Sequence, residues 1–111
     1  MILWAFNRGW CYINISNILS KYTRKTDRVG RWGGEEFIII CPKTDLEEAS
    51  NLAEKLRDKI AKYQFDKVGN KTASFGVVSY KEDDTLIELL SRADDAMYLA
   101  KSKGKNRVEV M

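Results

Sequence analysis

The feature that most constrains this chain is a pair of glycines between two β-prone runs, in the stretch RVGRWGGEEFIIIC over residues 28–41. Adjacent glycines accept the positive φ angles of a tight turn, and the flanking β-branched and aromatic residues favour strands. The stretch therefore predicts a β-hairpin that turns through Gly33–Gly34. The continuous apolar run from Phe37 to Ile40 predicts a strand buried on both faces.

Three segments with helical spacing of apolar residues surround this hairpin, over residues 11–24, 44–65 and 85–103. The spacing of Thr44 with Glu47, and likewise of Thr85 with Glu88, predicts a capping box at the start of the second and third helix. We expect the inner face of the second helix to consist of Leu46, Ala49, Leu52, Ala53, Leu56 and Ile60.

Two more β-prone runs follow, over residues 72–80 and 106–110. Gly76 in the first run predicts a bulge or a close approach of another backbone, and Gly104 suits the end of the third helix. Strands that alternate with helices in this order predict a mixed α/β sheet domain with flanking helices.

Composition excludes several functions. The chain has 111 residues, a net charge of +3 and no histidine, so every histidine-based triad or zinc site is excluded. Its basic and acidic residues are interspersed, which argues against a nucleic-acid partner. The opening MILWAF is too short to span a membrane, so we expect no membrane contact by this chain. Cys11 and Cys41 lack metal-ligand spacing and are expected to be reduced thiols of a cytoplasmic protein.

Charged residues in and near the hairpin permit two interpretations. Glu35 and Glu36 could hold a divalent cation beside phosphates that approach the glycines, or they could be solvated acids of an ordinary turn. Arg24 and Asp27, upstream, could bind a phosphodiester or a guanine edge, or form a solvated connection. Lysines around Gly104 could reach a triphosphate, or could simply suit the helix dipole.

Taken together, three motifs resemble the GGDEF family, the diguanylate cyclase domain. They are RKTDRVGRWGGEEF, with the signature variant GGEEF; TASFGVVSY; and ADDAMYLAKSKGKN. The resemblance runs from about residue 15 to residue 110. It implies a ferredoxin-type core like that of nucleotidyl cyclases, in a bacterial signalling transferase.

In that family two domains meet antiparallel and join two GTP molecules into cyclic di-GMP, releasing pyrophosphate, with Mg²⁺ or Mn²⁺ ions bridging the phosphates. The resemblance therefore implies GTP and cyclic di-GMP as ligands, and a homodimer or other self-association. By motif match Glu35 would be a metal ligand and Glu36 would act at the metal or at the attacking hydroxyl. The residues that would contact phosphates are Gly33, Gly34, Lys101 and Lys105.

The family also has a site at which the product inhibits the enzyme, an Arg-x-x-Asp motif placed five residues before the glycine pair. Arg24 and Asp27 have this register. The resemblance implies that they clasp a guanine and a phosphate of cyclic di-GMP, with Lys55 on the next helix as a further contact.

The chain departs from the family pattern at its start. The first-strand D-x-D carboxylates and the two guanine-reading motifs, F-K-x-I-N-D and G-H-x-x-G-D, are absent. We therefore expect a single truncated domain over residues 1–111, with 1–10 an atypical apolar segment and 11–111 family-like, whose core lacks its first strand. MILWAF would either fill that gap or drive self-association.

The same departure leaves the activity open. One hypothesis is a diguanylate cyclase domain that is poorly active or inactive as this fragment. The alternatives are a degenerate module that binds cyclic di-GMP without turnover, and a dimerisation domain. The intact GGEEF sequence favours the first hypothesis, and the missing motifs favour the second.

Overall fold

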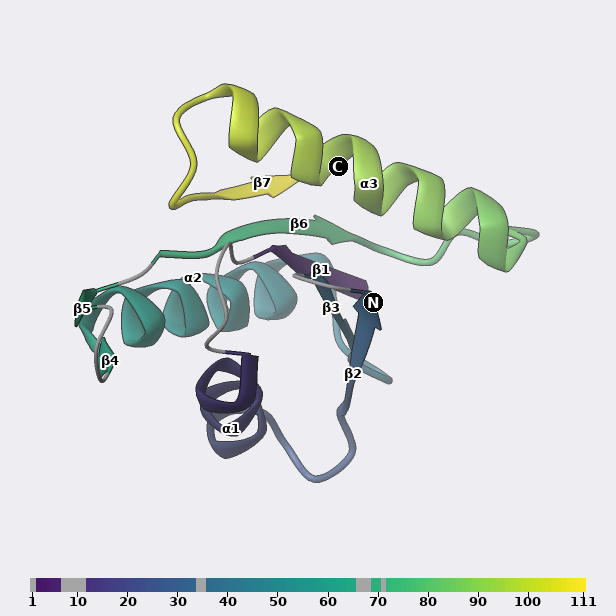
Figure 1. Cartoon of the computed structure of the whole chain (residues 1–111). Helices are drawn as coiled ribbons and strands as arrows, with labels where there is room; N and C mark the ends of the chain where they lie inside the picture. The colour runs from purple at the N-terminus through teal and green to yellow at the C-terminus, as the bar shows by residue number, and fades with distance from the viewer. Residues whose placement is uncertain (1, 7–11, 34–35, 66–68, 71) are drawn as a thin grey trace.

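The computed structural model describes residues 2–6, 12–33, 36–65, 69–70 and 72–111 (Figure 1). The elements along these residues, in chain order, are β1 (Ile2–Phe6), α1 (Tyr12–Tyr22), β2 (Arg28–Gly33), β3 (Glu36–Ile40), α2 (Leu46–Lys62), β4 (Gln64–Phe65), β5 (Gly69–Asn70), β6 (Ser74–Val78), α3 (Leu86–Ser102) and β7 (Val108–Val110). The three predicted helices and the four predicted strands are all present. The strands β4 and β5, which pair with each other, were not predicted, because two residues are too few to show a periodicity.

Five strands form one sheet in the order β2-β3-β1-β6-β7. Neighbouring strands are antiparallel except β6 and β7, which are parallel. Figure 1 shows α1 and α2 on one face of this sheet and α3 on the other. The predicted mixed α/β architecture is confirmed.

The centre of the sheet is a strand that the sequence analysis expected to be missing. Ile2–Phe6 lies between β3 and β6, with Phe6 opposite Glu36 on one side and opposite Ser74 on the other. The expectation that the core lacks its first strand is therefore wrong, and the alternative that MILWAF fills the gap is confirmed. Without this segment β3 and β6 would each present an unpaired edge, which a β-prone apolar segment relieves by hydrogen bonding.

The hairpin of β2 and β3 forms as predicted. Gly33, which was predicted to lie in the turn, is the last residue of β2 and lies opposite Glu36, whereas Gly34 and Glu35 lie outside the described residues. Phe37, Ile38 and Ile39 are buried, but Ile40 is 45% exposed, which corrects the prediction that the whole run is buried. Ile40 shares a face with Ile38, and α3 packs on that face over β1 and β6 rather than over the end of β3.

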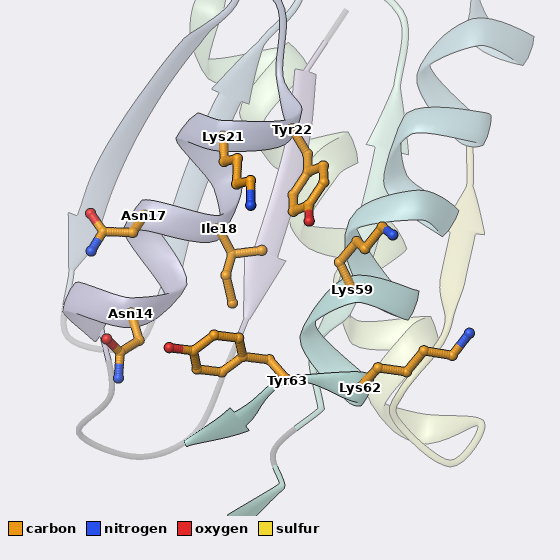
Figure 2. A pocket seen from close by; sticks show the side chains of 8 residues that line it. All are labelled: Asn14, Asn17, Ile18, Lys21, Tyr22, Lys59, Lys62 and Tyr63. Atoms are coloured by element: carbon orange, nitrogen blue, oxygen red, sulfur yellow. The ribbon is translucent and has the colours of Figure 1, made fainter. Parts of the chain in front are cut away.

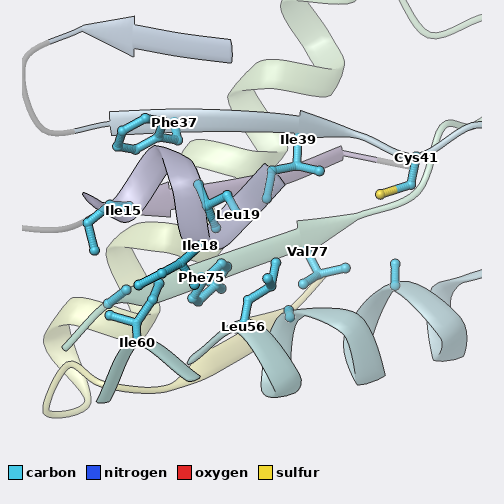
Figure 3. Packing of buried hydrophobic residues seen from close by; sticks show 13 residues of the cluster. Ile15, Ile18, Leu19, Phe37, Ile39, Cys41, Leu56, Ile60, Phe75 and Val77 are labelled. Carbon is cyan, nitrogen blue, oxygen red and sulfur yellow. The ribbon is translucent and has the colours of Figure 1, made fainter. Parts of the chain in front are cut away.

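The main core lies between the sheet and the two helices α1 and α2 (Figure 3). Its largest buried side chains come from both helices and from β3 and β6: Ile15, Leu19, Ile39, Leu56, Ile60, Phe75 and Val77. A smaller cluster lies under α3 and consists of Ile38, Val78, Leu89, Ala93, Ala96 and Met97. The predicted inner face of α2 is confirmed, with Leu46 and Leu52 partly buried at its margin.

The predicted close approach at Gly76 is confirmed. A β-carbon at this position would lie 2.7 Å from the carbonyl oxygen of Ala93 and 2.7 Å from the backbone nitrogen of Met97. Both atoms belong to the backbone of α3, which cannot move aside as a flexible side chain could. Gly76 therefore sets how closely α3 packs on β6.

The start of α2 differs from the prediction by one residue. Asp45, not Thr44, is the N-cap: its carboxylate accepts a hydrogen bond from the Glu48 backbone N–H at 2.8 Å, and Glu48 completes the capping box. Asp45 has the extended backbone of an N-cap, at φ −81° and ψ 172°, whereas the Thr44 hydroxyl donates to the Pro42 carbonyl. The predicted box of Thr44 with Glu47 is therefore wrong.

The capping box predicted at the start of α3 is confirmed. The Thr85 hydroxyl accepts from the Glu88 backbone N–H at 3.1 Å, and the Thr85 N–H donates to the Glu88 carboxylate at 3.0 Å. At the other end of α3 Gly104 has a φ of +116°, the left-handed conformation that glycine supplies after a helix C-cap. The expected end of the helix is therefore confirmed as well.

Candidate functional site

The GGEEF hairpin lies at one end of the sheet, where residues of four neighbouring strands lie opposite one another. Glu36 is the first residue of β3 and lies between Gly33 of β2 and Phe6 of β1, and Phe6 in turn lies opposite Ser74 of β6. The ladder shifts its register between Arg31 and Gly33, which is typical of a bulge. Glu36 is partly buried. The described end of the hairpin therefore presents one signature carboxylate beside the two central strands.

The lysines at the C-terminal end of α3, Lys101 in its last turn and Lys105 just beyond it, lie at the same end of the sheet. The Phe75 N–H donates to the Arg107 carbonyl at 2.9 Å, and Val108 lies opposite Phe75, so the connection from α3 to β7 passes beside the start of β6. The Lys105 N–H donates to the Ala100 carbonyl at 3.0 Å, which folds this connection back onto the helix.

Lys101 and Lys105 are thus at the same end of the sheet as Glu36, and the strands β1 and β6 lie between them and Glu36. Adjacent strands are about 4.8 Å apart, so the backbones of Glu36 and Ser74 are separated by roughly 10 Å. The fold therefore places both groups of predicted phosphate-binding residues at the same end of the sheet.

Few side chains near the hairpin are available to bind a divalent cation. Among the described residues no group of three or more histidine, cysteine, aspartate or glutamate side chains comes together. Mg²⁺ that bridges phosphates needs only one or two protein carboxylates, because phosphate oxygens and water complete its coordination. Glu36, with Glu35 in the adjoining turn, has the right chemistry. The central strand β1, which spans ILWAF, adds no carboxylate.

The Arg-x-x-Asp motif lies at the other end of the hairpin. Arg24 and Asp27 form a compact turn: the Asp27 N–H donates to the Arg24 carbonyl at 3.0 Å, and the Arg24 N–H donates to Asp27 Oδ2 at 2.9 Å. The Arg24 guanidinium reaches Asp27 Oδ1 at 3.3 Å. The Asp27 side chain is fully buried while that of Arg24 is half exposed.

Asp27 is therefore the anchor of this turn and Arg24 its outward-facing group. The hydrogen bond and the charge of Asp27 raise the pKa of the Arg24 guanidinium, so Arg24 stays cationic at every physiological pH. Arg24 also donates to the Thr44 hydroxyl, which ties it to the segment before α2.

Arg24 opens onto a hollow of about 220 Å³. Its lining residues come from the end of α1, the Arg24 turn and the first half of α2: Tyr22, Arg24, Thr44, Glu48, Leu52 and Lys55. The structure thus brings Arg24 and Lys55 to one hollow, with Asp27 buried beneath Arg24. We call it the arginine hollow.

No sequence pattern indicated Tyr22, Thr44 or Glu48 at this hollow. Thr44 is twenty residues from Arg24 along the chain and meets it only because β2 and β3 fold back on each other. The arginine hollow and the GGEEF turn lie at opposite ends of β2. Six strand residues at about 3.3 Å each separate them by roughly 20 Å.

This fold is an α/β domain with the GGEEF hairpin at one end of a five-stranded sheet and the arginine hollow at the other. Residues 10–107 match the family described as diguanylate cyclase, GGDEF domain. The chain belongs to the GGDEF domain family.

Curated relatives and solved structures support this assignment. Diguanylate cyclase DgcM of Escherichia coli K12 is 42% identical over 94 residues, which cover 85% of this chain but 23% of the relative. The active GGEEF domain of a diguanylate cyclase from Vibrio cholerae has a TM-score of 0.85 at 26% identity, covering 98% of this chain and 80% of that one.

Diguanylate cyclase SiaD from Pseudomonas aeruginosa, solved with its activator SiaC, has a TM-score of 0.89 at 25% identity and covers 99% of this chain and 49% of that one. The chain spans about a quarter or less of the length of curated relatives that it matches. It is therefore a partial match to longer proteins. Within the described part of the chain, no helix has the length and apolar character to cross a membrane.

Proposed function

We propose that this chain is a diguanylate cyclase domain, which pairs antiparallel with a second domain to join two GTP molecules into cyclic di-GMP in the bacterial cytoplasm. The observation that carries the proposal is the position of Glu36 beside Gly33 in the GGEEF hairpin, at the end of the sheet where the lysines at the C-terminal end of α3 also lie. The names of the relatives, among them diguanylate cyclase DgcM, point to the same reaction.

In this proposal Glu35 and Glu36 hold Mg²⁺ or Mn²⁺ at the hairpin. The ion, when bound, neutralises charge on the triphosphate and favours attack of a ribose hydroxyl on the α-phosphate. The absence of side chains at Gly33 and Gly34 lets the phosphates approach the backbone. Lys101 and Lys105 bind phosphate oxygens as cations, which orients the nucleotide along the end of the sheet.

We expect turnover by this chain alone to be slow. The family pattern places metal-binding carboxylates on the first strand, but β1 here consists of ILWAF and brings only apolar residues beside Glu36. The motifs that would read guanine are absent as well. The chain therefore has fewer groups to bind the metal and the guanine base than the family pattern provides.

A second candidate function is a module that binds cyclic di-GMP without turnover. The arginine hollow favours it, because Arg24 and Lys55 face one space and the buried carboxylate of Asp27 holds Arg24 in place. In a cyclase the same hollow would be the product-inhibition site, in which Arg24 and Lys55 contact phosphate or guanine and Asp27 positions Arg24.

A titration with Mn²⁺ and GTP, followed by NMR, tests the metal site. Paramagnetic Mn²⁺ at the hairpin is expected to broaden the amide signals of Gly33 and Glu36 first, and Glu36→Gln is expected to abolish that selective broadening. Glu82→Gln, an exposed glutamate in the loop before α3, is the matched control. Equal broadening in the wild type and Glu36→Gln would contradict a metal site at Glu36.

A further inference from the structure

A second hollow lies between α1 and the C-terminal half of α2, and Tyr22 is the one lining residue that it shares with the arginine hollow. It has a volume of about 320 Å³, which is within the range of small-molecule sites. The residues that line it are Asn14, Asn17, Ile18, Lys21, Tyr22, Lys59, Lys62 and Tyr63 (Figure 2). We call it the lysine hollow. None of these residues belongs to the metal site or to the Arg-x-x-Asp turn.

Its most unusual feature is the number of cations around one aromatic ring. The ammonium groups of Lys21, Lys55 and Lys59 lie 5.4, 5.4 and 5.3 Å from the centre of the Tyr22 ring. The ring attracts each of them through its electron-rich face, but the three ammonium groups repel one another. An anion placed among them would relieve that repulsion.

The carboxylates of the described chain do not supply this anion. The ion pairs among the described residues do not include Lys21, Lys55 or Lys59. Lys62, by contrast, pairs with Asp58 at 3.1 Å, and Figure 2 shows its side chain directed away from the hollow. Lys21 and Lys59 are therefore the two cations that the hollow offers to a ligand.

The remaining walls suit a flat ring. Tyr22 and Tyr63 contribute aromatic rings and Ile18 an apolar floor, while Asn14 and Asn17 provide amides that can donate and accept hydrogen bonds. Figure 2 shows Tyr63 reaching from the end of α2 toward the asparagine side of the hollow, opposite Lys21. Charge is thus concentrated on one side and aromatic and amide groups on the other.

We propose that the lysine hollow binds a nucleoside monophosphate. Its phosphate lies between Lys21 and Lys59, and its base lies beside Tyr63 with the asparagine amides at the base edge. Lysine binds phosphate as a point charge, and base–aromatic stacking tolerates any base because each has a π-face. The volume fits one nucleotide rather than two.

Adenosine 5′-monophosphate is the probe that tests this site, because it carries the one phosphate and the one base that the proposal requires. Binding is followed by amide chemical shifts in NMR titrations of the whole chain. We expect the largest shifts at Asn14, Lys21 and Tyr63. The double variant Lys21→Gln, Lys59→Gln should weaken binding at least about tenfold, which is the effect of losing one charged hydrogen bond.

The matched control is Lys25→Gln, Lys81→Gln, which removes the same charge from two exposed lysines that line neither hollow. It should bind like the wild type. Thermal melting of each variant confirms that it is folded. Adenosine, which lacks the phosphate, should not bind. Tyr63→Leu should weaken binding of adenosine 5′-monophosphate, and inorganic phosphate should still compete with the nucleotide in that variant.

Three results would overturn the proposal. Equal affinity in the Lys21→Gln, Lys59→Gln variant would show that these lysines are solvated cations only. Shifts confined to Gly33, Glu36 or Arg24 would place the ligand at the sites already described. Inorganic phosphate that binds as tightly as the nucleotide would show that the aromatic side of the hollow contributes nothing.

Discussion

The guanidinium of Arg24 lies 3.3 Å from the carboxylate of Asp27, and the same carboxylate accepts the Arg24 backbone N–H at 2.9 Å. One buried acid therefore fixes both the backbone and the side chain of the arginine above it. Because the Asp27 side chain is fully buried and that of Arg24 is half exposed, the pair presents a preorganised cation at the arginine hollow. Preorganisation lowers the entropy lost when a ligand binds.

Removing this cation should weaken binding of cyclic di-GMP. Arg24→Ala is expected to raise the Kd by roughly 10- to 100-fold, because charge-assisted hydrogen bonds to phosphate or guanine are lost. Isothermal titration calorimetry measures the effect. Lys25→Ala, an exposed cation next in the chain, should leave the Kd unchanged. The same Kd for Arg24→Ala and the wild type would rule out the arginine hollow as the product site.

Gly76→Ala should destabilise the domain, because the new β-carbon would lie 2.7 Å from backbone atoms of α3. Overpacking of this kind costs about 1–3 kcal/mol of the free energy of unfolding. Gly30→Ala is the matched control, since a β-carbon there meets no atom within 4 Å. Urea denaturation compares the two variants. Similar unfolding midpoints for both would contradict the close packing of α3 on β6.

Acid should weaken the connection between β6 and α3. Arg92 donates to both carboxylate oxygens of Asp84, at 2.8 and 2.7 Å, and to the Ser79 carbonyl at 2.7 Å. The hydrogen bond from Arg92, with a second from the Lys81 N–H, lowers the pKa of Asp84 to about 2. An unfolded aspartate titrates near about 3.9.

The lowered pKa fixes the sign of the pH effect. The folded state binds the Asp84 proton less tightly than the unfolded state does, so this contribution to stability is complete above about pH 4 and is lost as the pH falls toward about 2. Between about pH 4 and about pH 2 the free energy of unfolding of Asp84→Asn should therefore fall less than that of the wild type. Urea titrations at each pH measure this difference. Asp83→Asn, at the exposed neighbouring position, should behave like the wild type. The same acid loss in Asp84→Asn and the wild type would be evidence against the assigned role of the pair.

Cys41 should be inert in the folded protein. Burial raises the pKa of its thiol to about 12, and the nearby Asp27 carboxylate adds to the rise. At pH 8 only roughly one thiol in ten thousand would be the reactive thiolate. In a Cys11→Ser background, a chromogenic disulfide reagent should label Cys41 slowly until guanidinium unfolds the chain. Rapid labelling without denaturant would contradict the buried position of Cys41.

Local patterns in the sequence were sufficient to predict most of the elements. The glycine pair defined the hairpin, and apolar periodicity defined α1, α2 and α3, because both signals act between residues close in the chain. The Asp45 cap was misplaced by one residue because threonine and aspartate are adjacent and either can serve as N-cap. Ile40 was wrongly expected to be buried, because its exposure depends on how far α3 extends over the sheet.

For the central strand the sequence left two outcomes open: MILWAF would either fill the gap in the sheet or drive self-association. Ile2–Phe6 departs from the family pattern, and its place between β3 and β6 depends on partners at least thirty residues away. For the candidate sites, motif matching identified Arg24 and Lys55, which share a hollow. It missed Tyr22 and Thr44, since neither belongs to a motif. The roles of Glu35, Glu36, Lys101 and Lys105 remain predictions.

The measurement that tests the central claim most directly is the formation of cyclic di-GMP from GTP and Mg²⁺, separated by chromatography, over a series of protein concentrations. We predict slow product formation that rises more steeply than linearly with protein concentration, because two domains must meet. Glu36→Ala should abolish it and Glu82→Ala should not. No product at any concentration, or equal product from Glu36→Ala, would contradict the cyclase proposal and leave the cyclic di-GMP-binding module as the function to test.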